Sequence, residues 1–414
     1  MPRLLSLDAF RGFVILAMIW VNYIAGMPRI PYWLEHSSAT ADGITLPDLV
    51  FPAFLFIVGI AIPLALNREG GRFSAALAGR LLWRAGSLMA AGVVLANAYR
   101  YDASAALLPR AVYFLLFYVA MILLWRQGAQ RGAAFWGGLA LMLFLMASFR
   151  GQLNAEFSSV YLQHTWWGIL GMIGWAYLLC SVIYVAVDGK PPLLMAALAL
   201  LIVLYLAGTA GVLPLPQALN AFVNVPQVLG STSANVMAGT LVGTLFLRRP
   251  QSAGVSASVG GATGAVPADG AELPPAALHR RRIVLMACFA VALFGAGMLL
   301  RPLHGINKIQ ATESYALVCS GLVLALFLLF YVLIDVLHWR AWSALLMPAG
   351  ANALFAYIAP DLWEQLAAVL RLPRWWWPYL ESGGAQGLLN AAAMTVAMMG
   401  LTVLANRAGL RLKF

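Results

Sequence analysis

Charge and cysteine are both scarce in this sequence. Of its 414 residues, 10% are charged and three are cysteine, whereas 62% are hydrophobic. A chain so poor in charge cannot cover a water-exposed surface, which excludes a soluble globular protein. Cys180, Cys288 and Cys319 lie inside apolar runs, at spacings that suit neither a disulfide framework nor a metal site. We therefore predict no metal site and interpret the cysteines as small packing residues.

Long apolar runs recur from one end of the chain to the other. A helix needs about 20 apolar residues to cross a bilayer, and runs of this length give about twelve candidate spans. They lie near 8–27, 47–66, 77–97, 107–125, 132–149, 164–187, 192–212, 228–247, 283–301, 314–337, 343–361 and 385–405. The third, eighth and eleventh spans have the weakest pattern. The sequence predicts an all-α, multi-pass helix bundle in the bilayer, with one transmembrane domain over 1–414.

The net charge of +11 indicates membrane topology rather than affinity for nucleic acid. Cytoplasmic loops carry an excess of Lys and Arg, and both termini are therefore predicted to be cytoplasmic. The loops with His36 and with Lys308 then face the opposite side. The basic residues that define the cytoplasmic face are Arg68, Arg72, Arg80, Arg84, Arg248, Arg249, Arg280, Arg281, Arg282, Arg407, Arg411 and Lys413.

One stretch has the composition of a linker. Residues 250–277, between the eighth and ninth predicted spans, are rich in Gly, Ala, Ser, Val and Pro. They lack the Lys and the glycine spacing of a phosphate-binding loop. We predict a flexible cytoplasmic linker here, which divides the spans into eight and four without creating separate soluble domains.

Charged side chains also lie on the first predicted span. A charge at the bilayer centre costs about 2.5–3.5 kcal/mol on insertion scales, so such residues need a partner or a watery cavity. Asp8 and Arg11 are three residues apart on one helical turn, and we expect them to neutralise each other as an ion pair. The run continues without a small-residue cleavage site, so we expect it to remain as the first helix rather than be removed as a signal peptide.

Asn22, His36 and Asp48 form the candidate catalytic set. Asn22 and Asp48 lie at the outer ends of the first and second spans and His36 lies between them, so the three side chains can converge. A carboxylate hydrogen-bonded to a histidine fixes its tautomer and raises its basicity, which suits a general base. The alternative is that His36 is an ordinary loop histidine, Asn22 joins two helices and Asp48 caps a helix. The residues alone favour neither interpretation.

A second group of polar residues suits a nucleotide. Arg80, Trp83 and Arg84 lie at the inner end of the third span, where cations and an indole can bind phosphates and a base, or simply mark the cytoplasmic interface. Lys308 enters the tenth span within a polar stretch. Its side chain either lines the cavity where Asn22, His36 and Asp48 are predicted to meet or belongs to an ordinary interfacial loop.

Motifs along nearly the whole chain occur in the order of a known family. They are Ser6-Leu-Asp-Ala-Phe-Arg-Gly12, Val21-Asn22-Tyr23, His36, Thr45-Leu-Pro-Asp48-Leu-Val-Phe-Pro52, Phe56-Ile-Val-Gly59, Trp83-Arg84, Trp167-Gly-Ile-Leu, Gly174-Trp-Ala-Tyr177, Ser233-Ala-Asn-Val-Met-Ala-Gly239, Ile306-Asn-Lys308, Ser314-Tyr315, Asp335, Trp339, Pro348, Gly350, Asn352-Ala-Leu354 and Tyr357. This ordered set resembles the heparan-α-glucosaminide N-acetyltransferase family and its bacterial relatives of uncharacterised function.

The resemblance implies a transferase of a bacterial inner membrane. Such an enzyme moves an acetyl group from cytoplasmic acetyl-CoA to an amino sugar or other glycan on the far side. The family's essential histidine matches His36, and its nearby Asn and Asp match Asn22 and Asp48. The resemblance implies that His36 either deprotonates the acceptor or carries the acetyl group itself. The residues expected to contact the acetyl-CoA are Arg84, Trp83, Arg80 and Lys308.

The chain departs from the family in three places. Gly171-Met172 replaces a Gln-Arg pair, Ala41-Asp42-Gly43 replaces a Trp-Asn-Gly turn, and two additional spans lie within 107–149. The acceptor is therefore not inherited from the resemblance. A secondary transporter of sugars or amino-sugar fragments is the alternative, although no repeat relates the two halves. A scaffold without catalysis is a third hypothesis, and the oligomeric state is open, with a homodimer among the alternatives.

Overall fold

The computed structural model describes residues 4–67, 73–128, 132–155, 157–164, 166–247, 275–373 and 377–412. Helices make up this part of the chain and no strand is named within it, so the predicted all-α fold is confirmed. The α-helices are α1 (Leu5–Ile24), α2 (Val50–Leu66), α3 (Ala75–Ala96), α4 (Arg110–Trp125), α5 (Ala133–Ser148), α6 (Gly168–Ala186), α7 (Pro191–Thr209), α8 (Gln217–Val223), α9 (Ser233–Thr244), α10 (Pro275–His304), α11 (Glu313–Tyr331), α12 (Met347–Ala351), α13 (Ala353–Val369), α14 (Trp377–Ser382) and α15 (Gly384–Arg407).

Eight helices in the described ranges are long and apolar enough to cross a membrane. They are Leu5–Ile24, Pro47–Leu66, Ala75–Arg100, Gly168–Ala186, Pro191–Thr209, Pro275–His304, Glu313–Val336 and Gly384–Arg407. Each coincides with a predicted span, including the third, whose sequence pattern is weak. A multi-pass integral membrane protein is thereby supported, while the total of about twelve spans stays a prediction.

The other four predicted spans correspond to shorter or interrupted helices. Helices α4 and α5 are each 16 residues long. The eighth predicted span divides into a π-helical stretch, Val225–Thr232, and α9. The eleventh divides at Asn352, whose non-helical backbone (φ −133°, ψ 56°) separates α12 from α13. Backbone irregularity at membrane depth is tolerated only where protein or water surrounds it, and Asn352 is completely buried.

The predicted linker lies mostly outside the described residues. This holds for 250–274, and also for Arg68, Arg72, Arg248, Arg249 and Lys413, which were assigned to the cytoplasmic face. Residues 275–277, which close the predicted linker, form the first turn of α10 instead.

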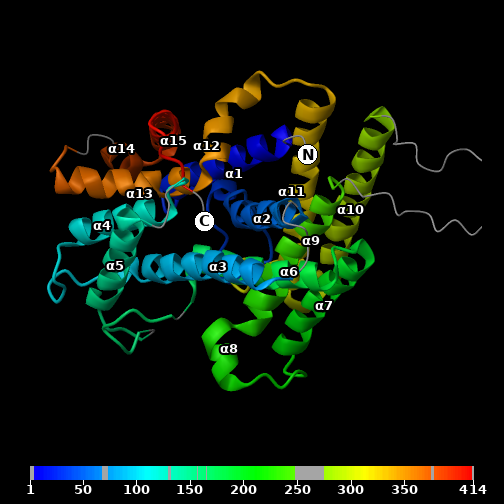
Figure 1. The fold of residues 1–414 in the computed structure, drawn as a ribbon, viewed down its shortest axis with the longest axis horizontal. Coiled ribbons are helices and arrows are strands. Elements are labelled where there is room, and N and C mark those ends of the chain that lie inside the picture. Colours follow the sequence, from blue (N-terminus) through cyan, green and yellow to red (C-terminus); the bar gives the residue numbers. More distant parts are fainter. Residues whose placement is uncertain are drawn as a thin grey trace, which may run out of the picture.

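Helices α1 and α2 lie at the centre of the bundle (Figure 1), and α2 packs along α9. The α2–α9 contact depends on two glycines. A Cβ atom added at Gly59 would lie 2.0 Å from the Val236 carbonyl oxygen, and one added at Gly239 would lie 2.1 Å from the Phe56 carbonyl oxygen. Small residues let membrane helices approach backbone to backbone, because lipid gives little hydrophobic driving force for helix association.

We expect Gly59→Ala to destabilise the bundle by about 1–3 kcal/mol, the usual cost of overpacking a core. The backbones of α2 and α9 would have to move apart to admit the methyl group. Gly86→Ala on α3 is the matched control, since a Cβ there meets nothing within 4 Å. Unfolding in a detergent titration measures both variants, and equal midpoints for Gly59→Ala and wild type would contradict the packing argument.

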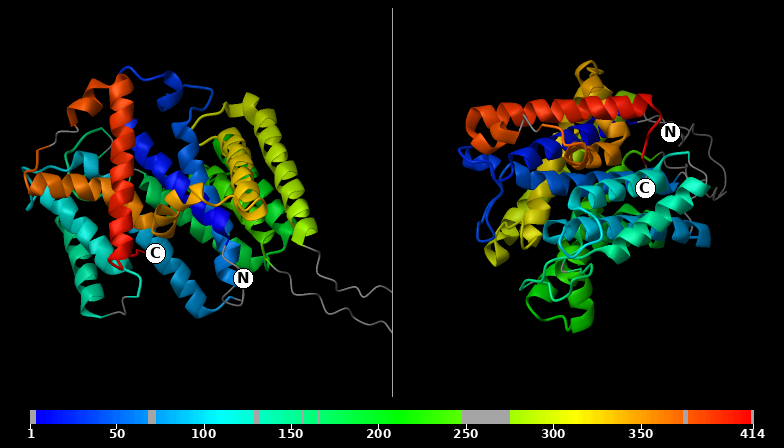
Figure 2. Two further views of the ribbon diagram at one scale, coloured as in Figure 1. Left: turned by 90° about the horizontal axis from the view of Figure 1, so that it is seen from above. Right: turned by 90° about the vertical axis from the view of Figure 1, so that its left-hand side faces the viewer.

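The two ends of the bundle carry different parts of the chain. Gly350 on α12 packs against Asp8 at the start of α1, and Asn352 hydrogen-bonds Asn406 at the end of α15. The other end of α15 meets the segment after α1, where the Gly384 N–H donates to the Pro28 carbonyl. Figure 2 (left) shows the start of α1 and the end of α15 at one end, and the loop between α1 and α2 at the other. We call these the terminal end and the loop end.

Candidate functional site

Asp48 is the buried anchor of the site. It lies in the 3₁₀ turn Pro47–Leu49 that leads into α2, and its side chain is 0% exposed. Its Oδ2 accepts hydrogen bonds from the Thr45 N–H (3.1 Å) and hydroxyl (2.9 Å) and from the Ser37 N–H (3.3 Å) and hydroxyl. These donors leave Oδ1 for other partners. Asp48 is not the N-cap residue of α2, because α2 begins after Leu49 without a side-chain cap.

His36 lies directly against this carboxylate. Its Nδ1 is 3.0 Å from Asp48 Oδ1, and 39% of its side chain is exposed. Across the described residues, the other ring nitrogen, Nε2, has no hydrogen-bond partner. In the tautomer that carries its proton on Nδ1, His36 donates this proton to the carboxylate and keeps the Nε2 lone pair available. The predicted pairing of His36 with Asp48 is present.

Lys308 completes the cluster. Its Nζ lies 3.2 Å from Asp48 Oδ1 and 2.7 Å from His36 Nδ1. The ammonium group neutralises the buried carboxylate, which would otherwise be costly at this depth. An ammonium only donates hydrogen bonds, so Lys308 donates to Nδ1 when the imidazole proton is on Nε2. When Nδ1 carries the proton, Asp48 Oδ1 accepts from both Lys308 and His36. Lys308 therefore lies in the His36 cluster and not with Arg80, Trp83 and Arg84, the residues with which it was grouped.

Two loops dock to bring these residues together. Lys308 belongs to the loop between α10 and α11, and the Nδ2 of its neighbour Asn307 donates to the Ala39 (2.8 Å) and Ala41 (3.0 Å) carbonyls. Asp42 accepts from the Ile306 N–H at 2.7 Å and from Arg301 at 3.1 Å. The Ile306 hydrogen bond, with Arg301, lowers the pKa of Asp42. The departure at Ala41-Asp42-Gly43 thus falls where the two loops meet.

Sequence reasoning missed several supporting residues. Tyr315 is 3% exposed and donates its hydroxyl proton to the Asp48 backbone carbonyl at 2.6 Å. Ser37 and Thr45 bind the carboxylate as described above. Thr45-x-x-Asp48 has the spacing of a capping box, in which a carboxylate accepts from the N–H three residues before it. That spacing was the available signal for Thr45, whereas Tyr315 belonged to the Ser314-Tyr315 motif of the resemblance without a role assigned to it.

A second histidine–carboxylate pair lies on α10 and α11, the two helices joined by the loop that carries Lys308. His304 Nδ1, at the end of α10, is 3.0 Å from Glu313 Oε1 at the start of α11. The Glu313 side chain is 0% exposed, and that of His304 is 30% exposed. The pair holds the two ends of the loop that carries Lys308.

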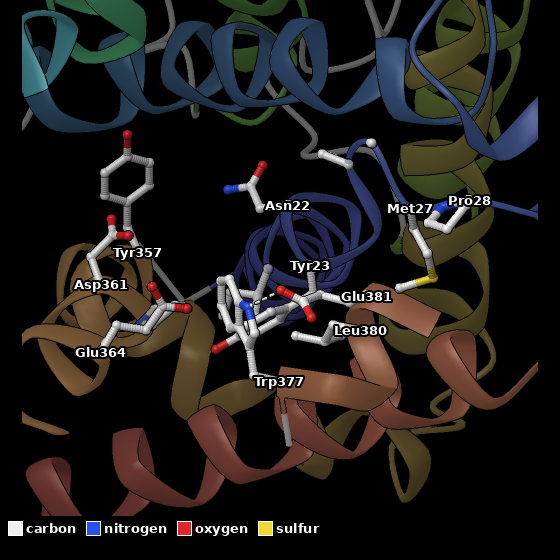
Figure 3. Close-up of a pocket in the computed structure, with 14 residues that line it drawn as sticks. Asn22, Tyr23, Met27, Pro28, Tyr357, Asp361, Glu364, Trp377, Leu380 and Glu381 are labelled. Carbon is white, nitrogen blue, oxygen red and sulfur yellow. Dashed lines mark hydrogen bonds between the residues drawn. The ribbon is translucent and has the colours of Figure 1, made fainter. Parts of the chain in front are cut away.

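Asn22 does not join the His36 cluster. It is exposed on α1 and lines a separate cavity with Tyr23, Asp361 and Glu381 (Figure 3). In the part of the chain that the structure describes, no hydrogen bond links Asn22 to His36 or Asp48. The expected convergence of all three residues is therefore wrong for Asn22, because Asn22 lines the cavity between α1, α13 and α14 instead.

The predicted nucleotide residues share a cavity at the terminal end. A space of about 460 Å³ lies between the end of α2 and the start of α3, and Arg80, Trp83 and Arg84 line it together with Tyr177 of α6. The Arg84 guanidinium lies 4.6 Å from the centre of the Tyr177 ring. Its Nε is buried and, within the described ranges, has no hydrogen-bond partner. Such an orphaned cationic donor fits an anionic ligand.

The predicted Asp8–Arg11 ion pair is present. The Arg11 Nη1 lies 3.1 Å from Asp8 Oδ1 and 3.2 Å from the Gly350 carbonyl oxygen. The pair therefore neutralises two charges on α1 and also joins α1 to α12. It lies at the terminal end, away from His36.

Comparison with known proteins gives a partial match. Over 99 residues the chain is 38% identical to heparan-alpha-glucosaminide N-acetyltransferase of Homo sapiens. The chain resembles this enzyme over one segment. The Mus musculus protein of the same name is 39% identical over 98 residues. Each match covers 23% of this chain and 14% of the relative, so the chain aligns with a small part of either relative's length. No family model matches the chain.

Proposed function

We propose that this protein is a transmembrane acetyltransferase of a bacterial inner membrane. In this proposal it takes the acetyl group from cytoplasmic acetyl-CoA and transfers it to an amino sugar or other glycan at the loop end. The observation that carries the proposal is the hydrogen bond between His36 and Asp48. The His36 ring is exposed, and its Nε2 has no hydrogen-bond partner among the described residues. The curated relatives, which are N-acetyltransferases by name, support the reaction class.

His36 acts as the general base in this mechanism. Nε2 takes the proton from the acceptor amine or hydroxyl as that group attacks the thioester carbonyl. The new C–N or C–O bond forms, the C–S bond breaks, and the CoA thiolate leaves and takes up a proton. Asp48 holds the imidazole in the required tautomer and stabilises the imidazolium that forms, and Lys308 neutralises Asp48 before and after the transfer.

In this proposal acetyl-CoA binds in the cavity at the terminal end. The orphaned Arg84 Nε and the Arg80 guanidinium can receive phosphates, and Trp83 offers a ring for stacking. The donor cavity and His36 lie toward opposite ends of α2, which at 1.5 Å per residue is about 26 Å long. The thioester arm therefore runs along α2 toward the loop end in this proposal.

Gly171 bears on the departure from the family's Gln-Arg pair. It packs against α3, where a Cβ added at the facing Gly92 would lie 2.4 Å from the Gly171 nitrogen. The backbones of α3 and α6 therefore lie against each other at Gly92 and Gly171. A Cβ added at Gly171 would itself lie 2.8 Å from the Trp167 side chain, so a long side chain at position 171 would displace Trp167. In this proposal the donor contacts come from α3.

We expect Arg84→Ala to raise the Kd for acetyl-CoA by about 10–100-fold, because a hydrogen bond to a charged group contributes about 1.5–3 kcal/mol. Binding of radiolabelled acetyl-CoA to the purified protein measures this. Arg126→Ala is the matched control, since Arg126 is exposed and lies outside the cavity. Unchanged affinity in Arg84→Ala would remove this residue from the donor site.

The activity itself is tested with radiolabelled acetyl-CoA and a panel of glucosamine-containing acceptors. The purified wild-type protein should release CoA and form labelled product with at least one acceptor. Hydrolysis without an acceptor, measured in parallel, gives the background. Absence of acetyl-CoA binding, together with uptake of an unmodified sugar into proteoliposomes, would replace the proposal with a transporter.

A further inference from the structure

A second cavity, of about 400 Å³, lies between α1, α13 and α14 (Figure 3). Its volume is that of a small-molecule site. Its lining combines three carboxylates with three aromatic rings, and the described residues that line it include no Lys, Arg or His. The carboxylates are Asp361, Glu364 and Glu381, and the rings are those of Tyr23, Tyr357 and Trp377.

The walls of this cavity are held in place. Trp377 donates its indole N–H to Glu381 Oε1 at 2.6 Å, and Tyr118 of α4 hydrogen-bonds Asp361. The segment after α1 is joined to the start of α15, since the Gly384 N–H donates to the Pro28 carbonyl at 3.1 Å. Arg29 also donates to the Ser382 carbonyl. A site with fixed walls loses little freedom when a ligand enters.

The cavity is acidic in a chain whose net charge is +11. Carboxylates that share a site repel one another unless a cation joins them. A single chelated metal ion does not fit, because no group of three His, Cys, Asp or Glu residues in the described ranges could hold one. The cavity therefore suits separate positive groups along one molecule rather than one small ion.

The aromatic rings and one hydroxyl add to this argument. Tyrosine and tryptophan faces attract ammonium groups and pack against methylene chains. The Tyr23 hydroxyl oxygen is buried in the cavity wall and has no hydrogen-bond partner among the described residues. A buried unpaired polar group is costly, and a ligand ammonium can donate a hydrogen bond to this oxygen.

We propose that this cavity binds an organic polyamine, an extended chain with two or more ammonium groups separated by methylenes. The ammonium groups pair with Asp361 and Glu381, and the methylenes lie against Tyr357 and Trp377. This site is separate from His36 and Lys308, and the proposal does not depend on acetyl transfer.

Titration calorimetry with spermidine tests the site, using full-length protein in nanodiscs of phosphatidylcholine. Saturable binding is expected, at least 10-fold tighter than that of butylammonium, because one ammonium can meet only one carboxylate. Affinity should fall as salt rises, because the contacts are ionic. Empty nanodiscs give the background from lipid.

Variants locate the binding. Asp361→Asn and Glu381→Gln should each weaken spermidine binding about 10-fold or more, since each removes a charge-assisted contact of about 1.5–3 kcal/mol. Asp188→Asn is the matched control: Asp188 is exposed outside the cavity, and its left-handed backbone (φ 55°) accepts Asn. No saturable binding by the wild type, equal affinity for butylammonium, or unchanged binding in both cavity variants would overturn the proposal. The wild-type comparison stands even if a variant fails to fold.

Discussion

His36→Ala should lower the rate of acetyl transfer by about 10²–10⁴-fold, the usual contribution of a positioned general base. The reason is that Nε2 is the one ring nitrogen of His36 left unpaired by the Asp48 and Lys308 contacts. The Kd for acetyl-CoA should stay unchanged, because the donor cavity lies toward the opposite end of α2. Initial rates of CoA release at saturating acceptor measure the effect, and radioligand binding measures the Kd.

Imidazole rescue, a control variant and protein labelling complete this test. Added imidazole should restore part of the His36→Ala activity, because a soluble base can enter the space that the side chain vacates. His164→Ala is the matched control, since His164 packs against Trp167 and Phe222, away from the cluster. Label that stays on wild-type protein after rapid denaturation at neutral pH, and that is absent from His36→Ala, would instead make His36 an acetyl carrier. Undiminished turnover in His36→Ala would remove His36 from the chemistry.

Asp48→Asn should lower both activity and stability. Asparagine keeps the size of the side chain but removes the charge that Lys308 and His36 face. We expect the rate to fall about 10²-fold, the cost of a misplaced catalytic group. We expect the free energy of unfolding to fall by about 1–3 kcal/mol, because an amide NH₂ would face the donors of Ser37 and Thr45. CoA-release assays and detergent-induced unfolding measure the two effects separately.

A double-mutant cycle with Lys308→Met separates the two roles of Asp48. Adding Lys308→Met to Asp48→Asn removes the unpaired ammonium, so the double variant should be more stable than the sum of the single changes by about 0.5–3 kcal/mol. Its activity should stay low, because His36 still lacks its carboxylate. Additive stability losses would mean that the Lys308–Asp48 contact carries no energy, and restored activity would contradict the positioning role of Asp48.

Hydropathy predicted the regular helices well because length and apolarity decide whether a helix can cross a bilayer. The interrupted segments escaped the same reasoning. In the stretch around Asn352, composition gave an apolar run, but the break depends on tertiary hydrogen bonds from Asn352 to Asn406 and Leu410. The π-helical stretch Val225–Thr232 likewise packs on α7, which no local pattern reports.

The candidate site was predictable where its residues are close in sequence. His36 and Asp48 lie in one loop, and their pairing follows from the hairpin of α1 and α2. Lys308 comes from a loop 272 residues away from His36, and its place depends on the docking of Asn307 and Asp42. The prediction for Asn22 was wrong although Asn22 is close to His36 in sequence. Nearness in sequence does not fix the direction in which a helix end points its side chains.

Acetyl transfer across the membrane of proteoliposomes tests the proposed function most directly. Labelled acetyl-CoA is supplied only at the face of the chain termini and a glucosamine acceptor only at the opposite face, with orientation determined by protease access. We predict labelled, acetylated acceptor on the acceptor side while CoA stays on the donor side, and no such product with His36→Ala. Acceptor that crosses the membrane unmodified, or product that forms only when donor and acceptor share one side, would contradict it.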